Sequence, residues 1–452
     1  MGKYKLLIPL ATILILMIWA LPALLKAIPD RYIARLPEPM QELGLPEERN
    51  PILPTVASPV KAQELIGDQA ENNQDSTSNP TPTLNPSLGT GSPTVTADGE
   101  TTTEANEPPP TPIVTPTHTV TPSPTPWPWP TAARLTGFQH KFQEWNNCGP
   151  ATLAMALSYY DMNLNQMDTA AVLKPNPEDR NVSPQEMAAY VNDETPYHAL
   201  FRVNGTAETL RRLVSNNMPV IVEIGIEPPG EFRWLGWYGH YLLIVAYDDD
   251  QEKFWVYDSW FGTSEEPLQN AHPDGRELSY NDLENYWPHF NRNYVVLYRP
   301  EEFETLASII GAEMDGEVMW QKALSDAKND VAQQPDNAFF WFNLGTAYNA
   351  LGHYEQAATA FDQSRSIGLP WRMLWYQFGP YEAYLNTGRS EDVILLADTT
   401  LKDRPYFEES YYFKGLALEM QGNTEEAQRN FESAANFNPN FAPAVEALSN
   451  LN

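Results

Sequence analysis

Cys148 is the single cysteine of the 452-residue chain, and it stands where a loop runs into a predicted helix. Pro150 follows it closely, and proline is favoured in the first turn of a helix because its missing N–H would have no partner there. The positive end of a helix dipole stabilises a thiolate, the form of cysteine that attacks a carbonyl carbon. The position therefore predicts a nucleophile, with a buried structural cysteine as the competing interpretation.

A base and an acid for such a nucleophile lie on two predicted strands further along the chain. His240 opens the apolar run 241–247, and a second run, 254–257, ends at Asp258. The three aspartates 248–250 supply a turn, so an antiparallel hairpin returns Asp258 toward His240. Simple pairing about this turn leaves the two residues out of step, and a bulge or a loop departure has to close the gap.

Cys148, His240 and Asp258 together are the parts of a thiolate–imidazolium pair with an acid that orients the ring. The other histidines compete less well for the base, because they lie in proline-rich or repeat sequence, stand before the cysteine loop, or lack an adjoining strand with a paired acid. They are His118, His140, His198, His272, His289 and His353. A solvated or core role remains the alternative for any histidine taken alone, and it is the coupling of three residues that favours function.

The sequence around these positions resembles a known family. Residues 143–155, 239–250 and 256–258 are similar to the papain-fold domain of the bacteriocin-processing cysteine peptidases, which cut after a double-glycine leader. The resemblance covers about residues 136–300 and implies an α+β papain-like domain. Members that cut such leaders are fused to an ATP-driven exporter. This chain has no Gly-x-x-x-x-Gly-Lys-Ser/Thr phosphate loop and a single apolar span, so that specific role is disfavoured.

The resemblance also implies roles for individual residues. Carried over position by position, it gives Cys148 as the nucleophile and His240 as general base and then general acid. Asp258 would orient the imidazole, and Gln143 would donate to the oxyanion. Gln143 lies slightly closer to the cysteine than the corresponding glutamine of many papain-like enzymes, and Gln139 is a second candidate.

Such a site would carry out acyl transfer, in which thiolate attack gives a tetrahedral oxyanion and then a thioester. Water or another amine could resolve the thioester, so peptidase, amidase and transpeptidase activities all remain open. The aromatic stretch 232–239 before the base could line a cleft or act as a lid, and packing is the equal alternative. A non-catalytic peptide- or protein-binding module on the same fold is the function that competes with an enzyme.

The sequence of the N-terminal part predicts that the C-terminal domains lie outside the cytoplasm. Residues 6–25 form an apolar run of twenty residues after Lys3 and Lys5, long enough to span a bilayer. A membrane anchor over residues 1–30 is therefore expected, and a cleaved signal peptide, which would give a secreted protein, is the alternative. The linker 31–132 follows, rich in Pro, Thr and Ser, and it favours extended polyproline II structure. A single-pass membrane protein with its C-terminal domains outside is the expectation.

Residues 303–452 carry repeats of about 34 residues. The clearest unit has Trp341, Leu344, Gly345, Tyr348, Gly352, Ala357, Phe361 and Pro370. A later unit has Tyr411, Gly415, Gly422, Ala427, Phe431, Ala434 and Pro439. Degenerate copies are marked by Tyr384, Gly388 and Pro405 and by Gly311, Ala323 and Pro335, and residues 442–451 would cap the stack. These positions resemble tetratricopeptide repeats, which implies a surface for a protein partner; a spacer that binds nothing is the alternative.

Length and charge limit the number of domains and the classes of partner that the chain can have. The chain is long enough for two cores, which the patterns place at residues 133–302 and 303–452. A formal net charge of −31 disfavours nucleic acid as a partner, because phosphate binding needs a basic face. No metal-ligand cluster or nucleotide fingerprint is visible in the sequence, so no cofactor is expected.

Overall fold

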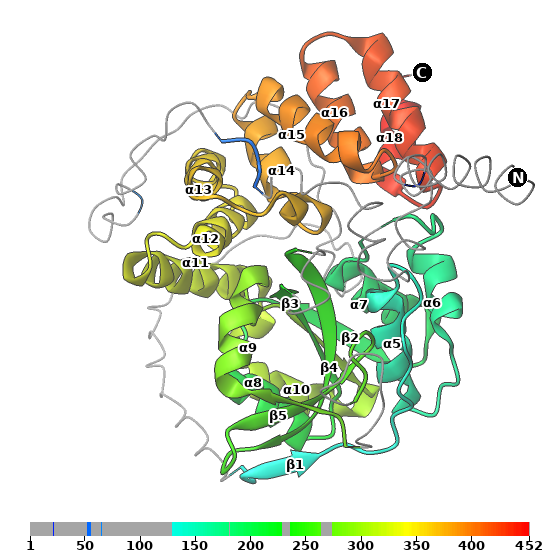
Figure 1. Cartoon of the computed structure of the whole chain (residues 1–452), viewed down its shortest axis with the longest axis vertical. Helices are drawn as coiled ribbons and strands as arrows, with labels where there is room; N and C mark the ends of the chain where they lie inside the picture. The colour runs from blue at the N-terminus through cyan, green and yellow to red at the C-terminus, as the bar shows by residue number, and fades with distance from the viewer. Residues whose placement is uncertain are drawn as a thin grey trace, which may run out of the picture.

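The computed structural model describes residues 21, 52–55, 65, 129–179, 181–227, 236–263 and 274–451. Most of the predicted anchor, 1–30, and of the predicted linker, 31–132, lies outside these residues. No helix within the described parts of the chain is long and apolar enough to cross a membrane. In Figure 1 the cyan-to-green part is a domain of helices and one sheet, and the yellow-to-red part is a stack of helices.

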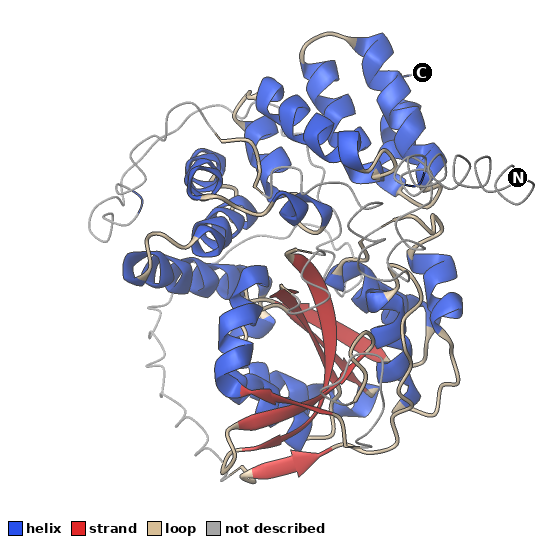
Figure 2. Ribbon diagram, in the orientation of Figure 1, coloured by secondary structure: helices blue, strands red, loops and turns tan. Residues whose placement is uncertain are grey.

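One antiparallel sheet of seven strands forms the centre of the first domain (Figure 2). The strand order is β2-β7-β3-β4-β5-β6, and β1 pairs with β4. The strands are β1 (Ala132–Arg134), β2 (His198–Arg202), β3 (Val220–Ile226), β4 (Tyr238–Asp248), β5 (Lys253–Asp258), β6 (Arg276–Ser279) and β7 (Tyr294–Tyr298). The central strands β3, β4 and β7 are buried on both faces, which explains their continuous runs of apolar and β-branched residues.

Helices cover both faces of this sheet. Successive strand residues point to opposite faces, so Leu243 packs under one helical layer while Leu242 packs under the other. The first layer is α5 (Cys148–Ser158), α6 (Gln166–Leu173) and α7 (Pro184–Glu194). The second is α8 (Ala207–Ser215), α9 (Tyr280–Tyr286) and α10 (Phe303–Ile310), with the 3-10 helix η2 (Trp287–Phe290) following α9. The α+β class expected from the sequence is confirmed.

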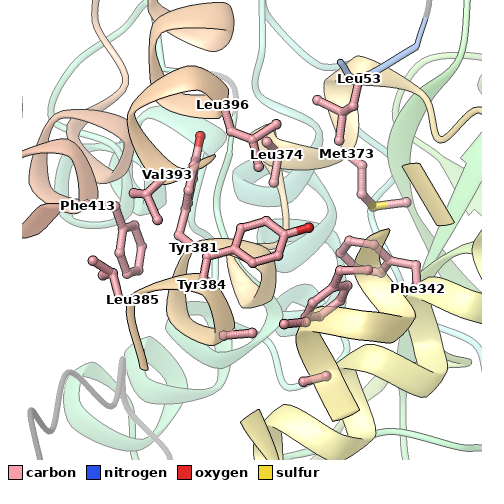
Figure 3. Packing of buried hydrophobic residues seen from close by; sticks show 14 of the residues in the cluster. Leu53, Phe342, Met373, Leu374, Tyr381, Tyr384, Leu385, Val393, Leu396 and Phe413 are labelled. Atoms are coloured by element: carbon pink, nitrogen blue, oxygen red, sulfur yellow. The ribbon is translucent and has the colours of Figure 1, made fainter. Parts of the chain in front are cut away.

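The second domain is a stack of helices arranged in pairs. Its helices are α11 (Gly316–Gln333), α12 (Ala338–Ala350), α13 (Tyr354–Ile367), α14 (Gly379–Asn386), α15 (Ser390–Asp403), α16 (Glu408–Met420), α17 (Thr424–Phe437) and α18 (Ala442–Leu451). Short 3-10 helices join some elements: η3 (Pro300–Glu302), η4 (Gly311–Met314) and η5 (Trp371–Trp375). Large apolar side chains such as Phe342, Tyr381 and Phe413 fill the space between the pairs (Figure 3).

Glycines in the repeats permit the close approach of paired helices. A Cβ at Gly345 of α12 would lie 2.7 Å from the Phe361 ring of α13, and one at Gly415 of α16 would lie 2.5 Å from the Phe431 ring of α17. The same glycine–phenylalanine contact thus recurs in two helix pairs, as the repeat spacing predicts.

The two domains share an interface. The side-chain amide of Asn343 in α12 donates to the carbonyl of Pro288 at 2.7 Å, and Asn204 donates to Asp326 of α11 at 2.7 Å. Leu306 and the other apolar residues of α10 pack into the core of the sheet domain. The first domain therefore continues through Ile310 before the repeats begin.

Candidate active site

Cys148 is the first residue of α5 and is half buried. Asn147, which precedes it, makes no side-chain cap to the helix, and no acidic residue lies in the first turn. Asn146 has a φ of 59°, a left-handed conformation that asparagine tolerates, and it turns the chain into the helix. The first N–H groups of α5 are therefore not taken by a cap and can donate to an anion at this helix end.

His240 and Asp258 lie on neighbouring strands, and a bulge sets their relation. Next to the turn, Ala246 pairs with Trp255, whereas further along Ile244 pairs with Val256, so Val245 is an extra residue in β4. Beyond the bulge Asp258 is opposite Leu242. His240 lies two residues before Leu242 on β4, so the side chains of His240 and Asp258 project from the same face of the sheet. The predicted hairpin is confirmed, and of the two predicted ways to close the gap, a bulge or a loop departure, the structure has a bulge.

The side chains of His240 and Asp258 meet inside the protein. Both are 1% exposed, and the imidazole Nε2–H donates to Asp258 Oδ1 at 2.8 Å. The backbone N–H groups of Trp260 and Phe261 donate to the same oxygen at 2.8 and 2.9 Å. Arg276 of β6 donates to the other oxygen, Oδ2, at 2.9 Å. The carboxylate is thereby fixed in one orientation toward the ring.

Electrostatics favour the charged form of both groups. Burial alone would lower the pKa of His240, but the charge of Asp258 and hydrogen bonds to Asp258 and Cys148 raise it to about 9. Burial would raise the pKa of Asp258, yet His240 and Arg276 hold it well below its usual range. Because Nε2 is bonded to Asp258, Nδ1 is the ring nitrogen left to face the Cys148 thiol.

Gln143 lies beside this group, and Gln139 does not. The backbone N–H of Gln143 donates to the carbonyl of Ser259 at 2.8 Å, and its side-chain Oε1 accepts from Ser259 Oγ at 2.8 Å. This bond engages Oε1 and leaves the side-chain amide nitrogen of Gln143 to donate elsewhere. The backbone N–H of Gln139 donates to Ser158, the last residue of α5, about 15 Å along the helix from Cys148.

Two residues at this site were not predicted from the sequence. Arg276 comes from β6 and pairs with Asp258, and His140 places its Nε2 2.8 Å from the backbone carbonyl of Asp258. Burial lowers the pKa of His140, against the opposing influence of Asp258. The spacing of the strands indicates neither contact, since Arg276 depends on the pairing of β6 with β5, and His140 on the path of the segment before α5.

Residues of the repeat domain pack next to His240. The guanidinium of Arg372, in η5, donates to the carbonyl of Trp237 at 3.0 Å. A Cβ at Gly239 would lie 3.1 Å from the ring of Tyr376, and the Gly239 main chain hydrogen-bonds the tyrosine oxygen. Burial and then the charge of Cys148 raise the pKa of Tyr376, so this hydroxyl lies in the electrostatic field of the thiol.

β5 pairs with β4 only as far as Leu242. The backbone of β4 at Gly239 is therefore not covered by β5 and can contact Tyr376. Tyr238 lies next to it, and its hydroxyl is buried with no hydrogen-bond partner among the described residues. Burial, followed by the charges of Asp258, Tyr376 and Cys148, raises the pKa of Tyr238 well above its ordinary value. Two tyrosine hydroxyls, one from each domain, therefore share the space around the thiol and the imidazole.

The aromatic stretch before the base falls partly outside the described residues, which exclude 228–235. Trp237 packs between the domains, stacked on Phe290 at 5.7 Å and tilted against Phe339 of α12 at 5.6 Å. His289 stacks on Phe339 at 3.7 Å and accepts a hydrogen bond from the Trp237 indole at 3.2 Å. For these residues the packing alternative holds.

No group of three or more His, Cys, Asp or Glu side chains in the described part of the chain is arranged to hold a metal ion. What is brought together is a thiol, an imidazole and a carboxylate, with amide donors close by. This set can carry out nucleophilic acyl transfer.

Family models match both domains. Residues 135–294 match the Peptidase_C39 like family, and residues 340–364 and 408–441 match the tetratricopeptide repeat. The predicted succession of a peptidase-like domain and tetratricopeptide repeats is thereby confirmed. No curated protein matches the chain.

Two solved structures are similar to parts of the chain at low identity. A candidate C39-like peptidase from Bacillus anthracis is 16% identical, with 37% of this chain and 98% of that chain covered and a TM-score of 0.29. MamA from residue 41 to its end, from Desulfovibrio magneticus RS-1, is 18% identical, with 30% and 75% covered and a TM-score of 0.27.

Proposed function

We propose that the Peptidase_C39-like domain of this chain, residues 135–294, is a cysteine peptidase whose nucleophile is Cys148. The observation that carries the proposal is the hydrogen-bonded row of the Cys148 thiol, the His240 imidazole and the Asp258 carboxylate. A pKa of about 9 for His240 supports an imidazolium at neutral pH, and such a cation stabilises a thiolate beside it.

In the first half of the reaction the Cys148 sulfur attacks the carbonyl carbon of a peptide bond. The carbonyl oxygen becomes an oxyanion, which accepts hydrogen bonds from the Cys148 backbone N–H and the Gln143 side-chain amide. As the C–N bond breaks, His240 gives its proton to the leaving amine, and a thioester remains on Cys148. The pair of electrons in the broken bond leaves with that amine.

In the second half His240, now neutral, takes a proton from water as the oxygen attacks the thioester carbon. The C–S bond breaks, the acid product leaves, and the thiolate–imidazolium pair is restored. Throughout, Asp258 holds the ring orientation and stabilises its charged form. Tyr376 and Tyr238 line the side of the site next to Gly239 and contact the bound peptide.

The same proposal places the enzyme outside the cytoplasm, attached to a membrane by residues 6–25. It is supported by the length of that apolar run and by the absence of Lys and Arg from residues 62–133. The repeats bind a protein partner or the substrate protein, which is the usual use of a stacked-helix surface.

A second function, a non-catalytic peptide-binding module, is favoured by one observation. Arg372 and Tyr376 of the repeat domain pack over residues 237–239, beside the thiol. A cover in that position would suit a domain that holds a peptide without cutting it.

The test is alkylation of the full-length protein by iodoacetamide, followed by mass spectrometry. Cys148 is the only thiol, so every adduct reports on it. The peptidase proposal expects alkylation at pH 6 at least about tenfold faster than that of free cysteine, because a paired thiolate is already ionised there. It also expects turnover of internally quenched peptides that Cys148→Ala abolishes.

A binding module would bind those peptides without cutting them. A wild-type protein that is alkylated no faster than free cysteine, and that cuts no peptide, would falsify the peptidase proposal.

A further inference from the structure

A short N-terminal segment, Ile52–Thr55, lies against the repeat domain, although 73 residues, of which the structure describes only Leu65, separate it from Trp129. Ile52 forms an antiparallel bridge with Pro370, and the Leu53 N–H donates to the carbonyl of Leu369 at 2.9 Å. The segment therefore pairs as a single extended strand with the loop after α13.

The side chain of Leu53 enters the core of the repeats. It is 1% exposed and belongs to the same apolar cluster as Met373 and Phe342 (Figure 3). Gly368, with φ of +123°, leaves room for Ile52, whose Cγ2 would lie 3.4 Å from a Cβ there. Burial of the leucine side chain removes its apolar surface from water and so stabilises the contact.

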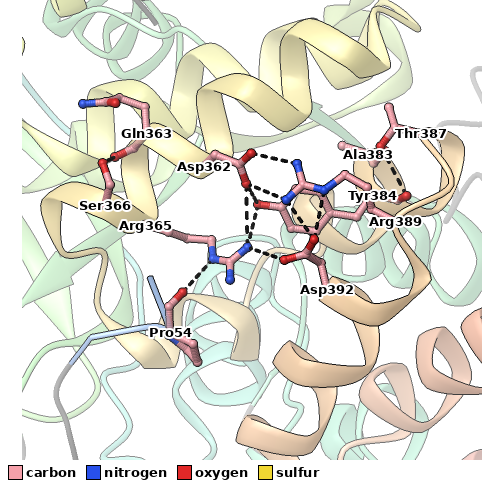
Figure 4. Close-up of polar contacts among 10 residues, drawn as sticks. All are labelled: Pro54, Asp362, Gln363, Arg365, Ser366, Ala383, Tyr384, Thr387, Arg389 and Asp392. Atoms are coloured by element: carbon pink, nitrogen blue, oxygen red, sulfur yellow. Dashed lines mark hydrogen bonds and ion pairs between the residues drawn. The ribbon is translucent and has the colours of Figure 1, made fainter. Parts of the chain in front are cut away.

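A buried arginine donates a hydrogen bond to the segment at Pro54. Arg365 of α13 is 1% exposed, and its Nε donates to the carbonyl of Pro54 at 2.8 Å (Figure 4). Its Nη1 donates to Tyr384 at 3.0 Å and to Asp392 at 3.3 Å. Its Nη2 has no hydrogen-bond partner among the described residues.

The carboxylates around Arg365 are already shared with a second arginine. Arg389 donates to both oxygens of Asp362, at 2.7 and 3.0 Å, and to Asp392 at 2.9 Å. These acids do not take up all the donors of Arg365. Because an unpaired donor on a buried cation is unfavourable, Arg365 needs a carbonyl oxygen from outside the repeats.

We propose that the repeat domain carries a binding site for an extended apolar-Leu-Pro peptide, and that the chain's own Ile52–Pro54 occupies it. In this site the Leu369 carbonyl accepts from a main-chain N–H of the peptide, and Arg365 donates to a main-chain carbonyl. The apolar core between them takes up the leucine side chain. Covalent connection gives the segment a high effective concentration, so the site is filled within the same chain.

Ile52–Thr55, which lies inside the predicted linker 31–132, is thus tied to the repeats. The proposal is independent of the peptidase activity, since none of its residues contacts Cys148.

The test is hydrogen exchange of the full-length protein. The wild type is expected to protect the Leu53 amide, and a Leu53→Asp variant to lose this protection while the repeat helices keep theirs. Thr55→Asp adds the same charge at an exposed position and is expected to leave protection unchanged. If residues 51–56 of the wild type exchange as fast as a free peptide, the site does not exist as proposed.

A second measurement uses a fluorescein-labelled synthetic peptide with the sequence of residues 50–57. It is expected to bind the Leu53→Asp protein at least about tenfold more tightly than the wild type or Thr55→Asp, whose sites are filled. The same peptide with aspartate in place of leucine is expected to bind none of them. Equal binding of both peptides to all three proteins would overturn the proposal.

Discussion

His240 and Asp258 point from the same face of the sheet because β4 contains one extra residue, Val245. Had the pairing next to the turn continued unbroken, Asp258 would lie opposite Leu243, and its carboxylate would project from the face away from His240. The bulge shifts the register by one residue and puts the acid 2.8 Å from the imidazole. A single irregularity in a strand thereby assembles the acid–base pair.

Replacing Asp258 with asparagine is expected to lower the pKa of His240 below its value of about 9, because burial then acts without the carboxylate. His240 must be protonated to release the amine. Turnover of quenched peptides in the wild type is therefore retained up to pH 9 and lost above it, and in Asp258→Asn the loss begins at lower pH. Once the pH exceeds the lowered pKa, the rate of the variant is expected to fall about tenfold for each further pH unit.

Arg276→Gln is the matched control, since it changes the same carboxylate in the opposite sense. Loss of the guanidinium leaves Asp258 less neutralised, so the pKa of His240 and the alkaline limit of turnover should rise. NMR titration of the His240 ring measures both shifts directly. Shifts of the same sign in the two variants would refute this account of the electrostatics.

Much of the site could be predicted because its parts lie in local patterns. The helix after Cys148 was marked by Pro150, and the β4–β5 hairpin by two apolar runs about three aspartates. The need for a bulge followed from counting residues. Its position could not be predicted, because it depends on how Leu135 of the segment after β1 bonds to the Val245 carbonyl, a contact between distant parts of the chain.

The contacts that sequence reasoning missed all join elements far apart in the chain. Tyr376, which follows the 3-10 helix η5 of the repeat domain, reaches Gly239. The strands β1, β2 and β6 are too short to carry a clear alternating pattern. Leu53 lies in a proline-rich context typical of a linker, and nothing local indicates that it is buried. Tertiary packing decides such positions.

Tyr376→Phe tests whether the repeat domain contributes to the site. The ring and its packing remain, and only the hydroxyl beside Gly239 and Cys148 is removed. If that hydroxyl contacts the peptide, KM or kcat for quenched peptides should worsen by up to about tenfold, the effect of one neutral hydrogen bond. Steady-state kinetics and thermal unfolding of the same preparation separate this effect from a loss of stability.

Tyr411→Phe removes a hydroxyl of the repeat domain that donates to Pro405 at an exposed position. Its kinetics should equal those of the wild type. Unchanged kinetics in Tyr376→Phe as well would mean that the hydroxyl only packs.

His289 makes the contact between the domains sensitive to acid. Burial lowers its pKa to about 4, so between pH 6.5 and 4 the unfolded chain takes up a proton that the folded chain does not. Its contribution to stability is thus present above pH 6.5 and is lost as the pH falls toward 4. The loss amounts to roughly 3 kcal/mol.

In His289→Phe this part of the acid sensitivity should disappear, because the ring still stacks on Phe339 but cannot be protonated. Urea unfolding of wild type and variant at a series of pH values gives the difference. His353→Phe changes an exposed histidine and should track the wild type. If the difference between His289→Phe and wild type does not change with pH, the pKa of His289 is not lowered.

Gly345→Ala tests the close packing of the repeats. The new methyl would lie 2.7 Å from the Phe361 ring, which is fully buried and cannot move aside, so a loss of roughly 1–3 kcal/mol in the free energy of unfolding is expected. Gly316→Ala is the control. It opens α11 with nothing within 4 Å of the new atom, and alanine favours a helix over glycine, so the protein should be as stable as wild type or slightly more stable. Chemical unfolding measures both, and equal stability of the two variants would mean that α12 and α13 do not approach as closely as the glycine–phenylalanine contact requires.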